Sequence, residues 1–116
     1  MIAQKQTYIP TVSSVQVQNW PADTSFASDI IEFKDSHKDW SISIFMDDNP
    51  TGATLTLDVA NDLTVGFNRY KTLSTDIDLS NSDNWSIFDD IMPFRYMKLR
   101  YNSGSAVGNI SIKMSI

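Results

Sequence analysis

The sequence predicts an all-β protein: an antiparallel two-sheet β-sandwich, jelly-roll-like, with about seven or eight short strands. Three observations predict this fold. Apolar and polar residues alternate with a period of two in several segments, turn-forming residues separate these segments, and no stretch keeps the 3.6-residue period of a helix. The length of 116 residues suits one domain with one core. We therefore expect a single β-sandwich domain at residues 13–116, preceded by an extended N-terminal arm at residues 1–12.

The clearest pair of predicted strands lies at residues 40–46 and 53–60. Apolar residues occupy every second position in both segments, as expected for strands with one buried face. The residues that face inward in this pattern are Trp40, Ile42, Ile44, Met46, Leu55, Leu57 and Val59, while Phe45 interrupts the polar face. The segment between the strands is rich in Asp, Asn, Pro and Gly, so we expect the two strands to form a hairpin.

The last two predicted strands alternate in the same way up to the end of the chain. Their inward-facing residues are Met97, Leu99, Tyr101, Ile110, Ile112, Met114 and Ile116. Glycine and serine dominate the segment between them, which predicts a terminal hairpin. Because the chain ends on an apolar inward position, we expect the C-terminus to be held in the sheet.

Weaker patterns predict the remaining elements. Val15 and Val17 alternate with glutamines in a strand that ends at Trp20 and Pro21. Residues 30–33 form a short apolar run, either a strand or a single helical turn. Two further strand patterns lie at residues 77–79 and 85–91, and the strand registers place Trp40 and Trp85 in the core.

The first twelve residues show no periodic pattern. Pro10 favours an extended chain and lacks a backbone donor. An extended segment can add to the sheet of a neighbouring subunit. Tyr8, Ile9 and Pro10 are therefore the candidate contacts with a protein partner.

Composition argues against several classes of function. The net charge of -5 repels phosphate backbones, which argues against a nucleic-acid partner. The absence of cysteine excludes disulfides, thiolate zinc sites and cysteine nucleophiles. No apolar run approaches the roughly 18 residues that span a bilayer, and the opening residues lack the apolar run of a signal peptide. We therefore expect a soluble product of the cytoplasm with no membrane partner.

No group of reactive side chains predicts an enzyme. The single histidine, His37, lies in a polar turn without a nucleophile motif, and the adjacent carboxylates at 47–48 and 89–90 diverge in an extended chain. Residues 76–84 begin like a calcium loop, but Asn81 and Ile87 occupy positions where an EF-hand needs glycine and glutamate. A calcium site of another kind in this loop stays open. We assign no catalytic residue, cofactor or metal ligand.

Aromatic side chains offer an alternative function. Trp and Tyr rings on sandwich folds can stack on sugar rings, although burial is the usual fate of large aromatics. Because the register places Trp40 and Trp85 inside, the candidate glycan contacts are Trp20, Tyr70 and Tyr96.

Two stretches together resemble a broad group of small virion proteins of tailed bacteriophages. Residues 50–62 contain a Thr-Gly pair, an alternating Leu-x-Leu-x-Val strand and an Asn-Asp end. Residues 94–110 contain an aromatic and hydrophobic strand that ends in Leu-Arg-Tyr before a Gly-rich turn. The resemblance covers mainly residues 40–116. It departs from the group at residues 63–65, where Leu-Thr-Val replaces a segment that commonly contains tryptophan.

The resemblance implies a non-enzymatic structural protein of the virion, in the first place a capsid decoration or cement protein made in the host cytoplasm. The implied partners are the major capsid protein or another virion protein, and the implied homo-oligomer is a trimer by analogy. Location on the capsid or on the tail stays open. The alternative is a carbohydrate-binding module of a phage fibre or tail tip.

Overall fold

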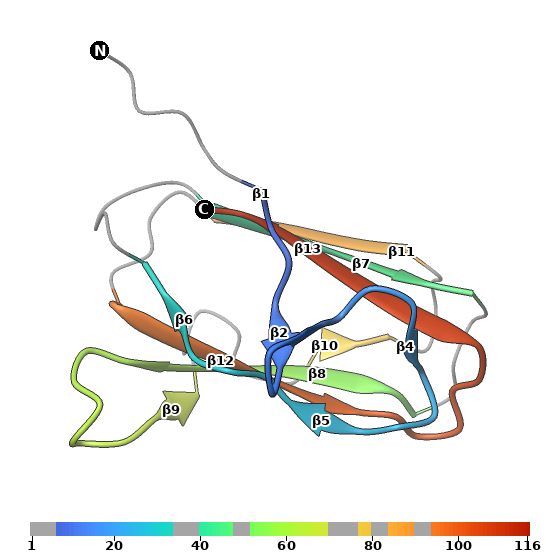
Figure 1. The fold of residues 1–116 in the computed structure, drawn as a ribbon, viewed down its shortest axis with the longest axis horizontal. Helices are drawn as coiled ribbons and strands as arrows, with labels where there is room; N and C mark the ends of the chain where they lie inside the picture. The colour runs from blue at the N-terminus through green and yellow to red at the C-terminus, as the bar shows by residue number, and fades with distance from the viewer. Residues whose placement is uncertain (1–6, 34–39, 48–51, 70–76, 80–83, 90–93) are drawn as a thin grey trace, which may run out of the picture.

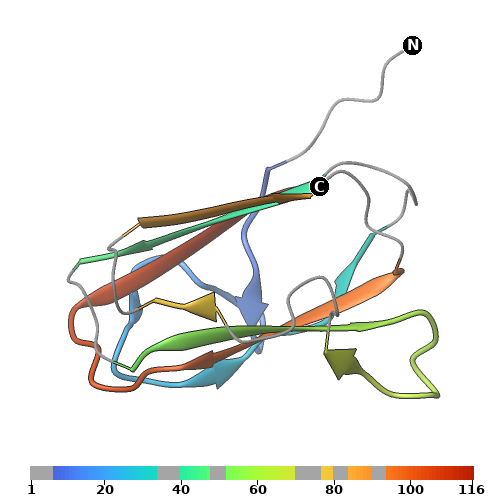
Figure 2. The same cartoon turned by 180° about the vertical axis from the view of Figure 1, so that it is seen from behind.

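The computed structural model describes residues 7–33, 40–47, 52–69, 77–79, 84–89 and 94–116. These residues form two layers of antiparallel strands, which Figures 1 and 2 show from opposite sides. No helix that could cross a membrane occurs in this part of the chain.

The first sheet is built on two long central strands, β13 (Asn109–Ser115) and β7 (Trp40–Met46). On one side, β13 pairs with two short segments, β1 (Thr7–Tyr8) and β4 (Trp20–Pro21). On the other side, β7 pairs with β11 (Asn84–Asp89).

The second sheet is built on β8 (Thr54–Ala60) and β12 (Tyr96–Asn102). Two short segments, β9 (Asn68–Arg69) and β10 (Ile77–Asp78), pair with the free side of β8. Two more, β5 (Phe26–Ala27) and β6 (Ile31–Glu32), pair with the free side of β12. A separate small hairpin joins β2 (Thr11–Val12) to β3 (Val15–Gln16).

The strand order is that of a jelly roll. If the short segments that share one edge are counted as one strand position, each sheet has four positions. Along the chain, every step crosses from one sheet to the other except the step from β8 to β9 and β10. This is the connectivity of an eight-stranded jelly roll. The predicted all-β, two-sheet sandwich is therefore confirmed.

Both predicted hairpins are wrong. The strands β7 and β8 lie in different sheets, and so do β12 and β13. Sandwiched sheets lie about 10 Å apart, and the connecting segments of six or so residues are long enough to cross that gap. Alternation identifies which face of a strand is buried. It does not show whether two successive strands pair in one sheet or lie in the two facing sheets, because both arrangements bury the same residues.

The core lies between the two sheets and contains the inward residues predicted for the four long strands, whereas Val15, which alternates with Val17 in the sequence, is 59% exposed. Trp40 is fully buried at the start of β7, and Phe33 packs edge-on against it at 6.2 Å between ring centroids. The C-terminal Ile116 is partly buried against this core, as expected. Phe45 is 46% exposed on the outward face of β7. Other buried residues are Ile42, Ile44, Leu55, Leu57, Val59, Met97, Leu99, Ile110, Ile112 and Met114.

A bulge divides the strand position formed by β5 and β6. Ala27 lies opposite Arg100 and Ile31 lies opposite Met97, so three residues face two residues of β12. Ser28 bridges this mismatch: its Oγ accepts a hydrogen bond from the Leu99 amide at 2.8 Å, and its own amide donates to the Leu99 carbonyl at 2.8 Å. The buried serine hydroxyl therefore satisfies a backbone donor that the bulge would leave unpaired.

Tyr101 ties β12 to the loop after β4. Its ring is buried beside Phe26, and its hydroxyl donates to the Ala22 carbonyl at 2.6 Å. Burial, with a smaller contribution from the charge of Asp23, raises the pKa of Tyr101 to about 12. The phenol therefore stays protonated as a donor at neutral pH.

Replacing Tyr101 by phenylalanine should lower the free energy of unfolding by about 1–3 kcal/mol, because the buried Ala22 carbonyl loses its donor. Urea denaturation measures this loss. Tyr96→Phe, at a half-buried position of the same strand, is the matched control and should change stability less. Equal effects of the two substitutions would contradict the role of the Tyr101 hydrogen bond.

Candidate interaction surfaces

A small hairpin closes one side of the sandwich. Residues 11–16, here called the bridging hairpin, consist of β2, β3 and a turn in which Ser13 and Ser14 have φ angles of 49° and 70°. Positive φ at both central positions defines a turn that normally favours glycine or asparagine. The serines therefore need support from outside the turn.

The Asp29 carboxylate provides that support. It accepts hydrogen bonds from the Thr11 hydroxyl at 2.6 Å, the Ser13 amide at 3.0 Å and the Ser14 amide at 2.9 Å. The Asp29 amide also donates to the Thr11 carbonyl at 2.7 Å. Asp29 belongs to the bulge on the second sheet, whereas the bridging hairpin interrupts the edge of the first sheet, so these bonds connect the two sheets.

Two pKa values are shifted at this site. The Thr11 hydroxyl, followed by the Ser14 amide, lowers the pKa of Asp29 from its usual 3.8. Burial raises the pKa of Tyr8 above 10.0, and the nearby charge of Asp29 adds to this effect. Asp29 is therefore ionised and Tyr8 is neutral at physiological pH.

The predicted arm contacts lie on the domain. Tyr8 is half-buried in β1 opposite Met114, and Ile9 is half-buried beside it. Pro10 is buried, and its carbonyl accepts a hydrogen bond from the Val17 amide at 2.8 Å. Residues 7–12 are thus the base of the arm, while residues 1–6 lie outside the described part of the chain.

Two of the three candidate glycan contacts lie far apart. Trp20 packs edge-on against Phe26 at 5.5 Å, and its indole nitrogen donates to the Thr24 carbonyl at 3.2 Å. Phe26 lies opposite Tyr101, five residues along β12 from Tyr96, a distance of about 17 Å. Tyr70 lies outside the described residues. The structure therefore does not bring Trp20 and Tyr96 into one sugar-binding platform.

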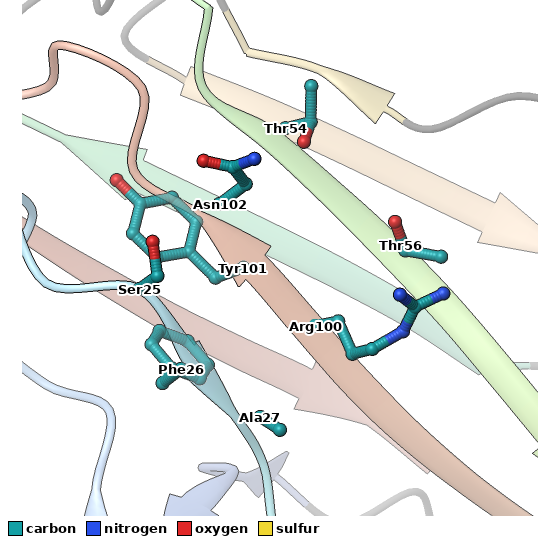
Figure 3. Close-up of a pocket in the computed structure, with 8 residues that line it drawn as sticks. All are labelled: Ser25, Phe26, Ala27, Thr54, Thr56, Arg100, Tyr101 and Asn102. Carbon is teal, nitrogen blue, oxygen red and sulfur yellow. The ribbon is translucent and has the colours of Figure 1, made fainter.

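A shallow depression of about 490 Å³ lies on the outer face of the second sheet (Figure 3). Arg100 lines it and makes a two-pronged ion pair with Asp58 on β8. Its polar lining groups include hydroxyls, an amide and the Arg100 guanidinium, and its lining residues are Ser25, Phe26, Ala27, Thr54, Thr56, Arg100, Tyr101 and Asn102.

A second surface is the loop at residues 61–67, here called the apolar loop, which extends beyond the sheet between β8 and β9 (Figure 1). Leu63 is 49% exposed and Val65 is 78% exposed. The Asp62 carboxylate accepts hydrogen bonds from the Thr64 amide at 2.9 Å and the Thr64 hydroxyl at 2.8 Å, and these bonds lower the pKa of Asp62. The loop thus holds two apolar side chains toward solvent on an internally bonded turn.

The oxygen-rich segment gives little structural evidence for a metal site. Asp78 is exposed in β10, opposite Thr54, while Asp76, Asn81 and His37 lie outside the described residues. Within the described ranges, no three His, Asp or Glu side chains gather where they could hold a metal ion.

Comparison with known proteins adds no relative. No family model, no curated protein and no solved structure matches the chain. The surfaces described above are therefore interpreted from their own geometry.

Sequence patterns did not reveal the bridging hairpin, the role of Asp29 or the apolar loop. Two serines in a two-residue turn conceal a turn type that glycine and asparagine usually mark. Leu63 and Val65 do carry a signal, because they follow the Asn-Asp end of a strand without belonging to an alternating segment.

Asp29→Asn should destabilise the protein at neutral pH and flatten its pH dependence. Because the folded pKa of Asp29 is lowered, the carboxylate stabilises the fold above the unfolded pKa of about 3.8, and this contribution is lost as pH falls through the folded pKa. The free energy of unfolding, measured by denaturation from about pH 6 to pH 2, should fall less steeply in the variant.

Asp62→Asn is the control for this experiment. The pKa of Asp62 is also lowered, but by Thr64 in its own turn, and such local bonds can persist when the tertiary structure is lost. An Asp62→Asn profile as flat as that of Asp29→Asn would refute a special role for the link between the sheets.

Proposed function

We propose that the protein is a non-enzymatic structural component of a bacteriophage virion, a capsid decoration or cement protein that acts through protein-protein contacts. The observation that carries this proposal is the apolar loop, because two exposed apolar side chains on a fixed turn suit a protein partner better than a reaction. Jelly rolls occur in viral capsid domains and in lectins, which is support by analogy of fold. The resemblance of residues 40–116 to small phage proteins adds to it.

The partner in this proposal is the major capsid protein or another virion protein. Leu63 and Val65 would enter an apolar depression on that partner, where burial of two side chains stabilises binding by about 3–6 kcal/mol before the costs of association. The arm would add a second contact. Its base is fixed in β1 by pairing with β13, so residues 1–6 continue from a defined place at the sheet edge.

A double variant, Leu63→Ser and Val65→Ser, should weaken binding to intact particles at least tenfold, with circular dichroism unchanged. Cosedimentation of purified protein with particles that lack it measures the binding. Val107→Ser is the matched control, since Val107 is 59% exposed on the loop between β12 and β13. Undiminished binding of the double variant would refute the apolar loop as the contact.

The arm is tested by removing residues 2–6 rather than residues 1–12, because the longer deletion would also remove β1 and β2. We expect the shorter variant to stay folded and to lose particle binding. Full binding by this variant would restrict the contact surface to the domain.

The second candidate function is carbohydrate binding at a fibre or tail tip. The depression in Figure 3 favours it, because hydroxyl, amide and guanidinium groups on a sheet face can hydrogen-bond sugar hydroxyls. Specific binding on a glycan array that is lost on Asn102→Ala, together with no binding to particles, would favour this function over decoration.

A further inference from the structure

A second depression lies along the bridging hairpin and the residues that follow it. It is open to solvent and has a volume of about 850 Å³, within the range of roughly 300–1,000 Å³ that small-molecule sites occupy. Its lining residues are Thr11, Ser14, Val15, Gln16, Gln18 and Asn19. This site, here called the amide depression, shares no residue with the depression in Figure 3.

The amide depression is polar but uncharged, because none of its six lining residues carries a charge. The side-chain amides of Gln16, Gln18 and Asn19 each offer a carbonyl acceptor and two N–H donors. All three side chains are exposed, and they form no hydrogen bond with another residue in the part of the chain that the structure describes. Their donors and acceptors therefore face solvent beside one another.

The backbone beneath the two glutamines is fixed. Val17 is fully buried between them, its amide donates to the Pro10 carbonyl at 2.8 Å, and its carbonyl accepts from the Ile112 amide at 3.0 Å. Because Gln16 and Gln18 flank this inward residue, both are directed to the outside. The Gln18 amide also donates to the Gln16 carbonyl at 2.9 Å, which sets the spacing of the pair.

Both ends of the segment are fixed as well. At the turn, the Asp29 carboxylate accepts from the Ser14 amide at 2.9 Å. At the other end, the Asn19 amide donates to the Ser111 hydroxyl at 2.9 Å, with a φ angle of 54° that asparagine tolerates better than most residues. A site whose backbone is already ordered loses less conformational entropy when a ligand binds.

Charge selects the class of ligand. The Asp29 carboxylate contacts the lining through the Thr11 hydroxyl and the Ser14 amide, so it disfavours phosphates and acidic sugars at this place. A neutral sugar hydroxyl both donates and accepts, as amides and hydroxyls do. Val15, which is 59% exposed, adds an apolar contact for the C–H face of a sugar ring.

We propose that the amide depression binds a neutral oligosaccharide, with Gln16, Gln18 and Asn19 forming hydrogen bonds to its hydroxyl groups. This proposal rests on carbohydrate binding, the second candidate function, for its ligand class. It assigns that ligand to a different site and excludes acidic sugars from it.

A glycan array that carries neutral oligosaccharides and their sialylated forms tests the class of ligand. We expect binding to neutral members and at least tenfold less binding to the sialylated forms. A double variant, Gln16→Ala and Gln18→Ala, should bind the neutral members at least tenfold more weakly, with circular dichroism unchanged. Asn68→Ala is the matched control, because Asn68 is an exposed amide on β9 outside both depressions, and it should bind like the unmodified protein.

The unmodified protein gives a second measurement by NMR. The side-chain NH₂ signals of Gln16 and Gln18, assigned by their absence from the double variant, should shift when the neutral oligosaccharide that binds best on the array is added. Signals that stay unchanged at saturation would overturn the proposal, as would preferential binding of the sialylated forms.

The double variant also separates this proposal from the functions proposed above. Loss of glycan binding on Asn102→Ala, with full binding by the double variant, would overturn the amide depression and assign carbohydrate binding to the depression in Figure 3. Absence of all glycan binding would overturn both sites. Because these experiments use no particles, either result leaves the virion function to be judged by cosedimentation.

Discussion

The apolar layer between the two sheets is the constraint on which the rest of the structure depends. A chain without cysteine has no disulfide between its layers, so the sheets stay packed together because their inward faces exclude water. Four long strands, β7, β8, β12 and β13, supply most of this layer. A jelly roll exchanges successive strands between the sheets, so every connection becomes a loop at one end of the sandwich.

Polar groups stabilise the edges of the sandwich, where the apolar layer ends. Ser28 replaces a missing backbone partner at the bulge, and Asp29 holds a hairpin whose own residues disfavour its turn. The two residues are adjacent, so one short segment of the second sheet both absorbs a change in register and connects to the first sheet. The border that carries the bridging hairpin therefore combines these hydrogen bonds with the burial of Pro10 and Val17.

The same packing and hydrogen bonds explain which surfaces remain available for interaction. On the outer face of the second sheet, Arg100 and Asp58 pair with each other beside the depression, and the arm base is packed on β13. Among the described residues, large apolar side chains are exposed at Leu63 and Val65 in the apolar loop, and elsewhere at Val15, Ile30, Phe45 and Val107. The apolar loop carries two of these side chains on one internally bonded turn, which suits a side-chain contact with a different protein.

The sequence by itself determined the fold class, the inward residues of the long strands and the buried position of Trp40. Alternation with a period of two records which face of a strand meets the core, and that information is local. The pairing of strands was decided only by the tertiary structure, since β7 and β8 satisfy the same alternation in one sheet or in two. The position of Asp29 against Ser13 and Ser14 was likewise decided there, because hydrogen bonds between residues distant along the chain leave no periodic trace in it.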